Sequence, residues 1–270
     1  MTKFSAWILL IVLHFQYVPE LQAKPYNTFI INVCHLRLGH RCLGCYIRQS
    51  WVLTLYECAW TAKQFKHVRL LAGNPTLDCY GGQYRSAVAV YLHPKTSLSS
   101  QRTGLIRLDE PFRMERGVSM VNVGKPSSPY DTCTIYKFSE DNIQEQELYA
   151  IPVYRTATEN CDSLFNYSYF ISKELMACAF SEKKLSFMET VKFAGISPVI
   201  CYGRLRGFVI AANGTTVGVL STYYDAEWID SIIRSNKYRI TQNSASITKT
   251  SHSKLCGFII VCSLIKKLTN

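Results

Sequence analysis

The sequence predicts an all-β fold, a barrel or a sandwich, from three features of its 270 residues. Apolar residues come in short runs rich in Val, Ile, Tyr and Thr, and turn-forming Gly, Pro, Asn or Ser separates many of these runs. Only one segment has the clear apolar spacing of a helix. Hydrophobic residues make up 48% of the chain and charged residues 18%, which excludes an intrinsically disordered protein and supplies a sizeable core.

The strand candidates are apolar runs of four to seven residues, a length typical of strands in globular proteins. Short strands with turn residues between them indicate a barrel or a sandwich. The clearest runs are Thr28–Val33, Trp51–Leu55, Val68–Leu71, Ala87–Leu92, Leu105–Leu108, Cys133–Phe138, Pro198–Cys201 and Leu205–Ala211.

The one helix that periodicity predicts begins near Asp225, whose side chain is suited to cap a helix N-terminus. This helix places Trp228, Ile229, Ile232 and Ile233 on one face. We expect that face to dock on the β-body as a closing element.

The N-terminal residues 1–23 predict a secretory signal peptide. Lys3 gives a basic start, Phe4–Phe15 form an apolar run broken only by one Ser and one His, and Ala23 is a small residue at the predicted cut. A membrane anchor is the alternative, but the run is shorter than a bilayer span requires. We therefore expect a secreted protein whose mature chain begins at Lys24.

Residues 237–270 form a basic tail that supplies +6 of the net charge of +11. Its first part, Thr241–Lys254, is a Ser/Thr-rich linker, and Leu255–Ile265 is an apolar run too short to cross a bilayer. A disordered extension, a processed lipid-anchor signal and reversible insertion into a membrane surface are the open interpretations. We expect any weak contact with an anionic membrane surface to go through this tail, and we expect no nucleic-acid partner.

Eleven cysteines are a high and odd number for this length. Such a number favours an oxidising compartment in which disulfides persist. At least one thiol is therefore free or paired outside the chain. The sequons that begin at Asn166 and Asn213 predict two N-glycosylation sites.

The most specific motif runs from Cys42 to Cys58 and reads CLGCYIRQSWVLTLYEC. It resembles the segment around the catalytic histidine in the trypsin/chymotrypsin-like (S1-type) serine proteases, because both cysteines, Gly44, Trp51 and Thr54 keep step with the family. Further stretches resemble the family in its own order: His93-Pro94, Arg102–Leu108, the strand from Cys133, Leu175–Cys178, Gly195–Gly207 and Asp225–Ile229.

The resemblance covers residues 24–236 and implies two packed six-stranded Greek-key β-barrels with a C-terminal helix. The boundary between the barrels is expected near residue 118, and the active cleft between them. The resemblance also implies three disulfides: Cys42–Cys58, Cys133–Cys201 and Cys161–Cys178.

The resemblance places the three positions of the catalytic triad at Glu57, Arg102 and Gly195. A serine protease needs an imidazole base, a carboxylate that orients it and a hydroxyl nucleophile. A carboxyl group with a pKa of about 4.3 is a poor base for a serine hydroxyl, and glycine has no nucleophile. In addition, Phe193 stands at an oxyanion-hole glycine position, and Ala194 at the aspartate position that pairs with the activated N-terminus. The chain is therefore similar to inactive members of the family, several of them linked to testis.

Several residues near these positions have a second interpretation. Ser197 is a loop serine or a relocated nucleophile with Glu57 as its base. Glu189 is the base of a retained specificity pocket, which would bind a basic side chain, or a surface carboxylate. Glu57 and Arg102 have opposite charges and are candidates for a salt bridge that plugs the degenerate site, with separate exposure as the alternative.

Five cysteines lack a partner in the family pattern. One further bridge is expected among Cys34, Cys45 and Cys79, with Cys34 and Cys79 as the best candidates. A zinc site that uses Cys34, His35, His40, Cys42 and Cys45 is disfavoured by irregular spacing, so no metal and no cofactor are expected. The tail cysteines, Cys256 and Cys262, are where the leftover thiol is expected.

The sequence thus predicts a secreted, non-catalytic binding protein on a trypsin-like scaffold, with an unidentified protein partner. A serine-type endopeptidase with rewired chemistry and a decaying gene product are the alternatives.

Overall fold

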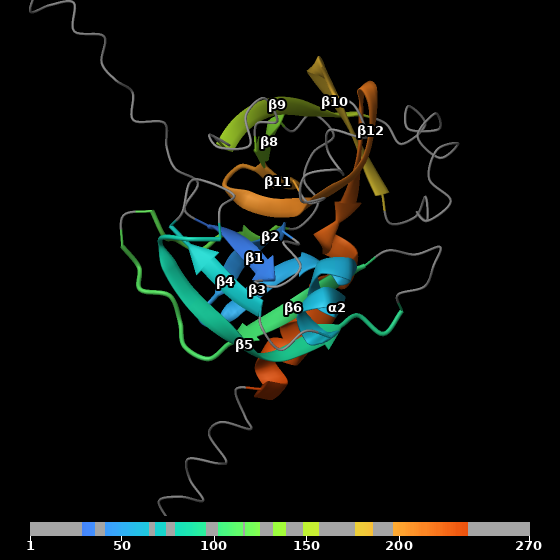
Figure 1. Ribbon diagram of the computed structural model, residues 1–270. Helices are drawn as coiled ribbons and strands as arrows, with labels where there is room; N and C mark the ends of the chain where they lie inside the picture. The colour runs from blue at the N-terminus through green and yellow to red at the C-terminus, as the bar shows by residue number, and fades with distance from the viewer. Residues whose placement is uncertain are drawn as a thin grey trace, which may run out of the picture.

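The computed structural model describes residues 29–35, 41–64, 68–73, 79–95, 102–115, 117–124, 132–138, 148–156, 176–185 and 197–236. The strands among these residues form two β-bodies packed against each other, with β1–β6 in one and β8–β12 in the other (Figure 1). Each of the eight apolar runs predicted as strands lies largely within an observed strand, so the all-β prediction is confirmed.

The first barrel is closed by six antiparallel strands in the order β1-β2-β3-β6-β5-β4. Aliphatic residues from four of its strands are fully buried: Ile31, Val52, Leu70 and Ile106. The strands are β1 (Ile30–His35), β2 (Arg41–Arg48), β3 (Trp51–Leu55), β4 (Val68–Ala72), β5 (Gln83–Leu92) and β6 (Thr103–Leu108).

The second barrel closes through a strand that folds back on itself. The first part of β12 pairs with β11, whereas the part after Gly214, which has a φ of +60°, pairs with β10. The two parts lie side by side, since a Cβ on Gly207 would collide with the carbonyl oxygen of Leu220. With β8 and β9 they complete the second six-stranded barrel. Its strands are β8 (Thr132–Phe138), β9 (Leu148–Thr156), β10 (Met176–Leu185), β11 (Ser197–Cys201) and β12 (Arg204–Ser221), with β7 (Asn122–Val123) added parallel to β12.

One helix, α2 (Tyr56–Gln64), is not predicted by apolar periodicity because only Cys58, Ala59 and Ala62 of its nine residues are buried. It packs beside β5 and β6. The close approach depends on Gly104, where a Cβ would collide with the Cβ of Ala59.

The C-terminal helix over 226–236 closes the molecule by returning to the first barrel (Figure 1). Its Trp228 ring meets His93 edge-on at 4.8 Å, and the Tyr91 hydroxyl donates to Oδ1 of Asn236 at 2.7 Å. The expected docking of this helix is thereby confirmed. The expected cap is wrong: the helix continues a 3-10 turn, η3 (Thr222–Asp225), that Ser221 caps, and Asp225 is buried and bonded elsewhere.

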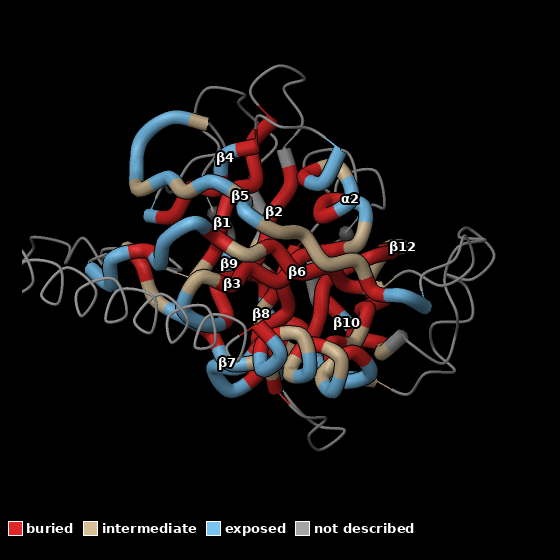
Figure 2. Tube along the Cα trace, turned by 90° about the horizontal axis from the view of Figure 1, so that it is seen from below, coloured by how far each residue is buried: buried red, intermediate tan, exposed pale blue. Residues whose placement is uncertain are grey.

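The core is shared by the two barrels and the closing helix. Ile200, Leu205 and Phe208 of the second barrel belong to the same buried cluster as the interior of the first barrel, together with Ile229 and Ile233 of the helix. Figure 2 shows these buried segments in the middle and the exposed turns around them. In the described part of the chain, no helix is both long and apolar enough to span a membrane.

Three disulfides join described cysteines: Cys34–Cys79, Cys42–Cys58 and Cys133–Cys201. The first confirms the further bridge expected in the first barrel, and the other two confirm family pairings. Cys178 is also disulfide-bonded to a residue outside the described ranges, so its predicted pairing with Cys161 stays a prediction.

One free thiol lies in the first barrel, whereas the tail cysteines Cys256 and Cys262, where a leftover thiol was expected, lie outside the described residues. Cys45 is free and fully buried, and this burial raises the pKa of its thiol. Cys45 belongs to the buried apolar cluster of the first barrel.

Candidate functional site

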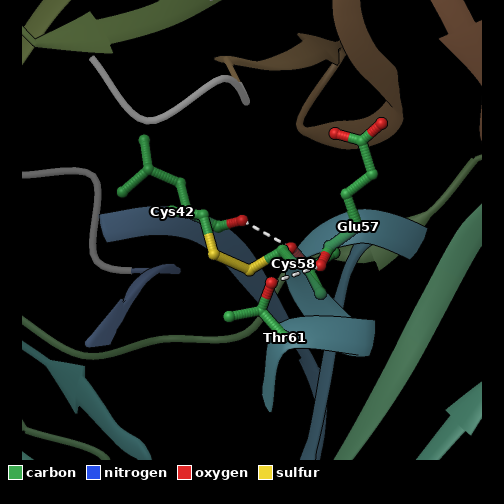
Figure 3. Close-up of a disulfide and its surroundings, with 6 residues drawn as sticks. Cys42, Glu57, Cys58 and Thr61 are labelled. Carbon is green, nitrogen blue, oxygen red and sulfur yellow. Dashed lines mark hydrogen bonds between the residues drawn. A yellow bond between two sulfur atoms is a disulfide. The ribbon is translucent and has the colours of Figure 1, made fainter. Parts of the chain in front are cut away.

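Glu57, which the sequence resemblance aligns with a catalytic histidine, lies in the first turn of α2 with an exposed side chain. The Cys42–Cys58 disulfide ties this turn to β2, and the Thr54 hydroxyl bonds the Leu43 carbonyl at 2.6 Å beside it. Figure 3 shows the Glu57 carboxylate extending away from the disulfide, while its backbone carbonyl accepts from Thr61 at 2.9 Å. The disulfide and these hydrogen bonds therefore fix the turn that carries the Glu57 carboxylate.

Arg102, which the sequence resemblance aligns with a catalytic aspartate, directly precedes β6 and forms a largely buried ion pair. Its Nη1 donates to Oδ1 of Asp225 at 2.8 Å, with the Arg102 side chain 13% exposed and the Asp225 side chain 1% exposed. Thr103 binds the other carboxylate oxygen through its backbone N–H at 3.0 Å and its hydroxyl at 2.7 Å. The carboxylate that Arg102 meets is Asp225, so the proposed pairing with Glu57 is wrong.

His93 completes this cluster. Its Nε2 lies 3.5 Å from Oδ1 of Asp225, and its Nδ1 accepts the backbone N–H of Lys95 at 3.2 Å. Burial lowers the pKa of His93; Asp225 opposes this effect, and the charges of Arg102 and Lys95 add to it. The imidazole is therefore neutral with its proton on Nε2, facing Asp225.

The cluster is closed to substrate, because both His93 and Asp225 are almost fully buried. A general base must reach the proton that it abstracts, and both nitrogens of His93 are already engaged. Instead, Asp225 at the start of the closing helix contacts His93 and Arg102 of the first barrel. These contacts connect the helix to the barrel, although 123 residues separate Arg102 from Asp225 in the sequence.

Among the other candidates, Ser197 is the first residue of β11 and is only 5% exposed. Its backbone pairs with Val209 inside the second barrel. Two zinc-donor candidates, Cys34 and Cys42, are used in disulfides, so the donor set suggested by the sequence does not form. No group of three or more His, Cys, Asp and Glu side chains suited to a metal occurs among the described residues.

Several predicted features lie outside the described residues. They are the signal segment 1–23, Cys161, Asn166, Glu189, Phe193, Ala194, Gly195 and the tail 237–270, together with the side chain of Asn213.

Three residues of the buried cluster escaped sequence reasoning: His93, Thr103 and Asp225. The one available signal was chemical. A largely buried guanidinium needs a carboxylate nearby, and Asp225 belongs to one of the motifs on which the sequence resemblance rests. The pairing of Arg102 with Asp225 was not predicted because 123 residues separate them in the sequence.

Comparisons with known proteins agree with this architecture. A family model described as "Trypsin" matches residues 18–187. Among solved structures, the chain is similar to kallikrein-related peptidase 10, with a TM-score of 0.61 and 19% identity over 79% of this chain and 98% of that one. It is also similar to a structure titled "Structure of GrC", with a TM-score of 0.62 and 16% identity over 78% of this chain and 96% of that one. A search of curated protein sequences finds no match.

Proposed function

The chain belongs to the trypsin family, and we propose that it is a secreted member that binds a protein partner without cleaving it. The observation that carries the proposal is the ion pair between Arg102 and Asp225, 2.8 Å long and buried. It supports the proposal because Arg102, which the resemblance aligns with the catalytic aspartate, has a guanidinium in place of a carboxylate.

The chemistry of the guanidinium supports this reading. In the family's reaction, a carboxylate accepts the imidazole N–H and stabilises the imidazolium that forms. A guanidinium has five N–H donors, no acceptor and a permanent positive charge, so it can do neither. Glu57 adds a carboxylate at the base position, where an ordinary pKa of about 4.3 makes it a weak base at neutral pH.

The alternative with rewired chemistry depends on Ser197 as nucleophile. A nucleophile needs an open approach for substrate and an adjacent base. The near-complete burial of Ser197 in β11 disfavours that role.

The test for catalysis uses a fluorophosphonate probe and a quenched peptide library on the purified chain. Ser197→Ala and, as a matched control, Ser86→Ala are compared, since Ser86 is exposed on β5. We expect neither labelling nor turnover in any of the three proteins. Labelling of the parent and of Ser86→Ala that disappears in Ser197→Ala would refute the proposal.

The binding half of the proposal is tested with extracellular fluid of the expressing tissue. The folded chain is expected to capture a defined protein in a fixed ratio that survives dilution. The same chain with its disulfides reduced serves as the control, because Cys42–Cys58 and Cys133–Cys201 hold the two barrels. Equal capture by both forms would contradict specific binding.

Secretion is supported by the disulfides, which persist in oxidising compartments. Expression in a secreting cell is expected to release a chain that begins at Lys24, with a mass that falls after glycan removal if Asn166 or Asn213 is modified. N-terminal sequencing of the medium fraction tests this directly, and retention of the full chain inside the cell would contradict it.

A further inference from the structure

We infer that two copies of this chain associate through the outer face of β5 and form a symmetric dimer. The inference goes beyond the proposed function, because it requires no other protein. Along the first half of β5, half-buried residues alternate with exposed ones, and Tyr84 and Val88 are 59% and 56% exposed. Met114, beside the start of the strand, is 55% exposed. Large apolar side chains that gather on the solvent side of one strand are typical of a surface that another protein covers.

One side of β5 carries a positive charge. β4 pairs with β5 so that Arg69 lies opposite Ser86, and the Arg69 guanidinium lies over the Tyr84 ring, 5.1 Å from its centre. A guanidinium that stacks on an aromatic ring keeps its in-plane N–H donors available to a carboxylate. Arg69 is exposed, and none of the described carboxylates pairs with it. Tyr84 therefore holds an unpaired positive charge beside the exposed apolar side chains.

The other side of β5 is acidic. The segment after β6 runs along this side, because the Asp109 backbone N–H donates to the Ser86 carbonyl at 3.0 Å and Gln83 Nε2 donates to Oε1 of Glu115 at 2.6 Å. Glu110 is exposed, and its carboxylate has no partner among the described residues. Three carboxylates and one guanidinium give the segment a net charge of −2: Asp109, Glu110, Arg113 and Glu115.

The two sides complement each other under a twofold rotation. Arg69 and Asp109 lie at the same level of β5, since each neighbours Ser86 on its own side. Neighbouring chains in a sheet are about 4.8 Å apart, so these two backbones lie roughly 10 Å apart across β5. A twofold axis that lies in the interface and runs along β5 exchanges the two sides. Arg69 of each copy then faces the acidic segment of the other, and Tyr84 and Val88 meet the same residues of the other copy.

A second copy matches this surface better than other occupants do. An acidic protein would pair with Arg69 but would be repelled by the segment 109–115. The basic tail 237–270, with its charge of +6, would pair with that segment but would be repelled by Arg69. A surface with opposite charges on the two sides of an apolar centre satisfies both sides, and this chain has such a surface itself.

The test measures the mass of the full chain against its concentration by sedimentation equilibrium. Accessible thiols are alkylated first, so that no disulfide-linked dimer forms. We expect a reversible equilibrium between monomer and dimer with a dissociation constant of about 10–100 μM, the range of a small, weak interface. A mass that stays monomeric up to about 1 mM would overturn the inference.

One pair of variants locates the interface on β5. Val88→Glu brings two like charges together at the twofold axis, and it is expected to raise the dissociation constant at least about tenfold. Tyr202→Glu is the matched control, because Tyr202 is an exposed apolar residue of the second barrel, 71% exposed, and its change is expected to leave the constant unaltered. Dimerisation that survives Val88→Glu unchanged would place the interface elsewhere and overturn the inference.

Charge reversal tests the twofold arrangement. Arg69→Glu and Glu110→Lys each bring like charges together twice in a symmetric dimer, so each alone is expected to raise the dissociation constant at least about tenfold. In a mixture of the two variants, both contacts of the mixed dimer again join opposite charges. Its dissociation constant, followed through a fluorophore on one variant, is expected to return to within about threefold of the parent.

Glu227→Lys provides the matched control for this mixture. It makes the same charge change at an exposed position of the closing helix, so it is expected to dimerise like the parent and to give Arg69→Glu no recovery beyond one restored contact. A mixture of Arg69→Glu and Glu110→Lys that dimerises no better than either variant alone would overturn the inference.

Discussion

Replacement of Arg102 by methionine is expected to destabilise the fold by about 3–5 kcal/mol, because it leaves a buried carboxylate without its counter-charge. Asp225 would keep only the two Thr103 donors, at 3.0 and 2.7 Å, and a distant contact with His93 at 3.5 Å. For a domain of this size, 1 kcal/mol corresponds to about 2–4 °C in Tm, so the loss amounts to roughly 10 °C.

A double-mutant cycle isolates the pair. Asp225→Asn keeps an acceptor for Thr103 and removes the charge, so Arg102→Met is expected to cost much less in this background. The coupling between positions 102 and 225 is expected to reach about 1.5–3 kcal/mol. Glu57→Gln provides the matched control, since Arg102 binds Asp225 rather than Glu57, and its coupling to position 102 is expected below about 0.5 kcal/mol.

Urea unfolding with intact disulfides, followed by tryptophan fluorescence, measures each corner of both cycles. A coupling below about 0.5 kcal/mol between 102 and 225 would refute the claim that this ion pair joins the helix to the barrel. A larger coupling between 57 and 102 would assign the counter-charge to Glu57 instead.

Four further predictions follow from the described contacts. Because burial lowers the pKa of His93, the unfolded chain binds a proton below about pH 6.5 that the folded chain does not bind. The contribution of His93 to the free energy of unfolding is therefore complete above about pH 6.5 and falls as the pH drops below this value. In unfolding curves between about pH 7 and 5, His93→Gln is expected to flatten this fall. The free Cys45 thiol is buried with a raised pKa, so iodoacetamide modifies it only after denaturation, and rapid labelling of the native chain would contradict its placement. Gly207→Ala pushes a methyl group into the Leu220 carbonyl and is expected to lower the free energy of unfolding in urea by about 1–3 kcal/mol. In the control variant Gly81→Ala, the new methyl group meets no atom within 4 Å, so only the backbone strain from its φ of +81° lowers the stability. Arg102→Asp destabilises more than Arg102→Met, because it adds a second carboxylate beside Asp225, and Asp225→Asn recovers most of the difference.

The strands most readily predicted were those whose apolar residues are contiguous. Trp51–Leu55 and Leu105–Leu108 are buried at nearly every position, and their residues are mostly apolar. β9 escaped prediction because Pro152 interrupts it, and proline normally argues against a paired strand. Pro152 is tolerated where its ring is exposed on the barrel surface.

The second barrel shows what local patterns cannot supply. The sequence from Arg204 to Ser221 contains both halves of a hairpin, and the chain reverses at Asn213-Gly214. Only the first half was predicted, because Gly218 interrupts the apolar residues of the second half. Similarly, the sequence made Cys34 and Cys79 candidates for a disulfide but could not establish that they pair. The pairing depends on how the barrel brings β1 close to the segment before β5.

The site around Arg102 also depends on a contact between residues that lie far apart in the sequence. The sequence resemblance predicts that positions 57, 102 and 195 lack catalytic residues, and the fold reveals in addition a structural role for Arg102. Its guanidinium neutralises a carboxylate from the start of the closing helix, and Thr103 and His93 complete the same cluster. A carboxylate can therefore return to position 102 only together with a change at Asp225, since two buried carboxylates at this distance cannot both stay charged. The residue at position 102 and the attachment of the closing helix are thus coupled, and a carboxylate at position 102 without a change at Asp225 removes the ion pair that joins the helix to the first barrel.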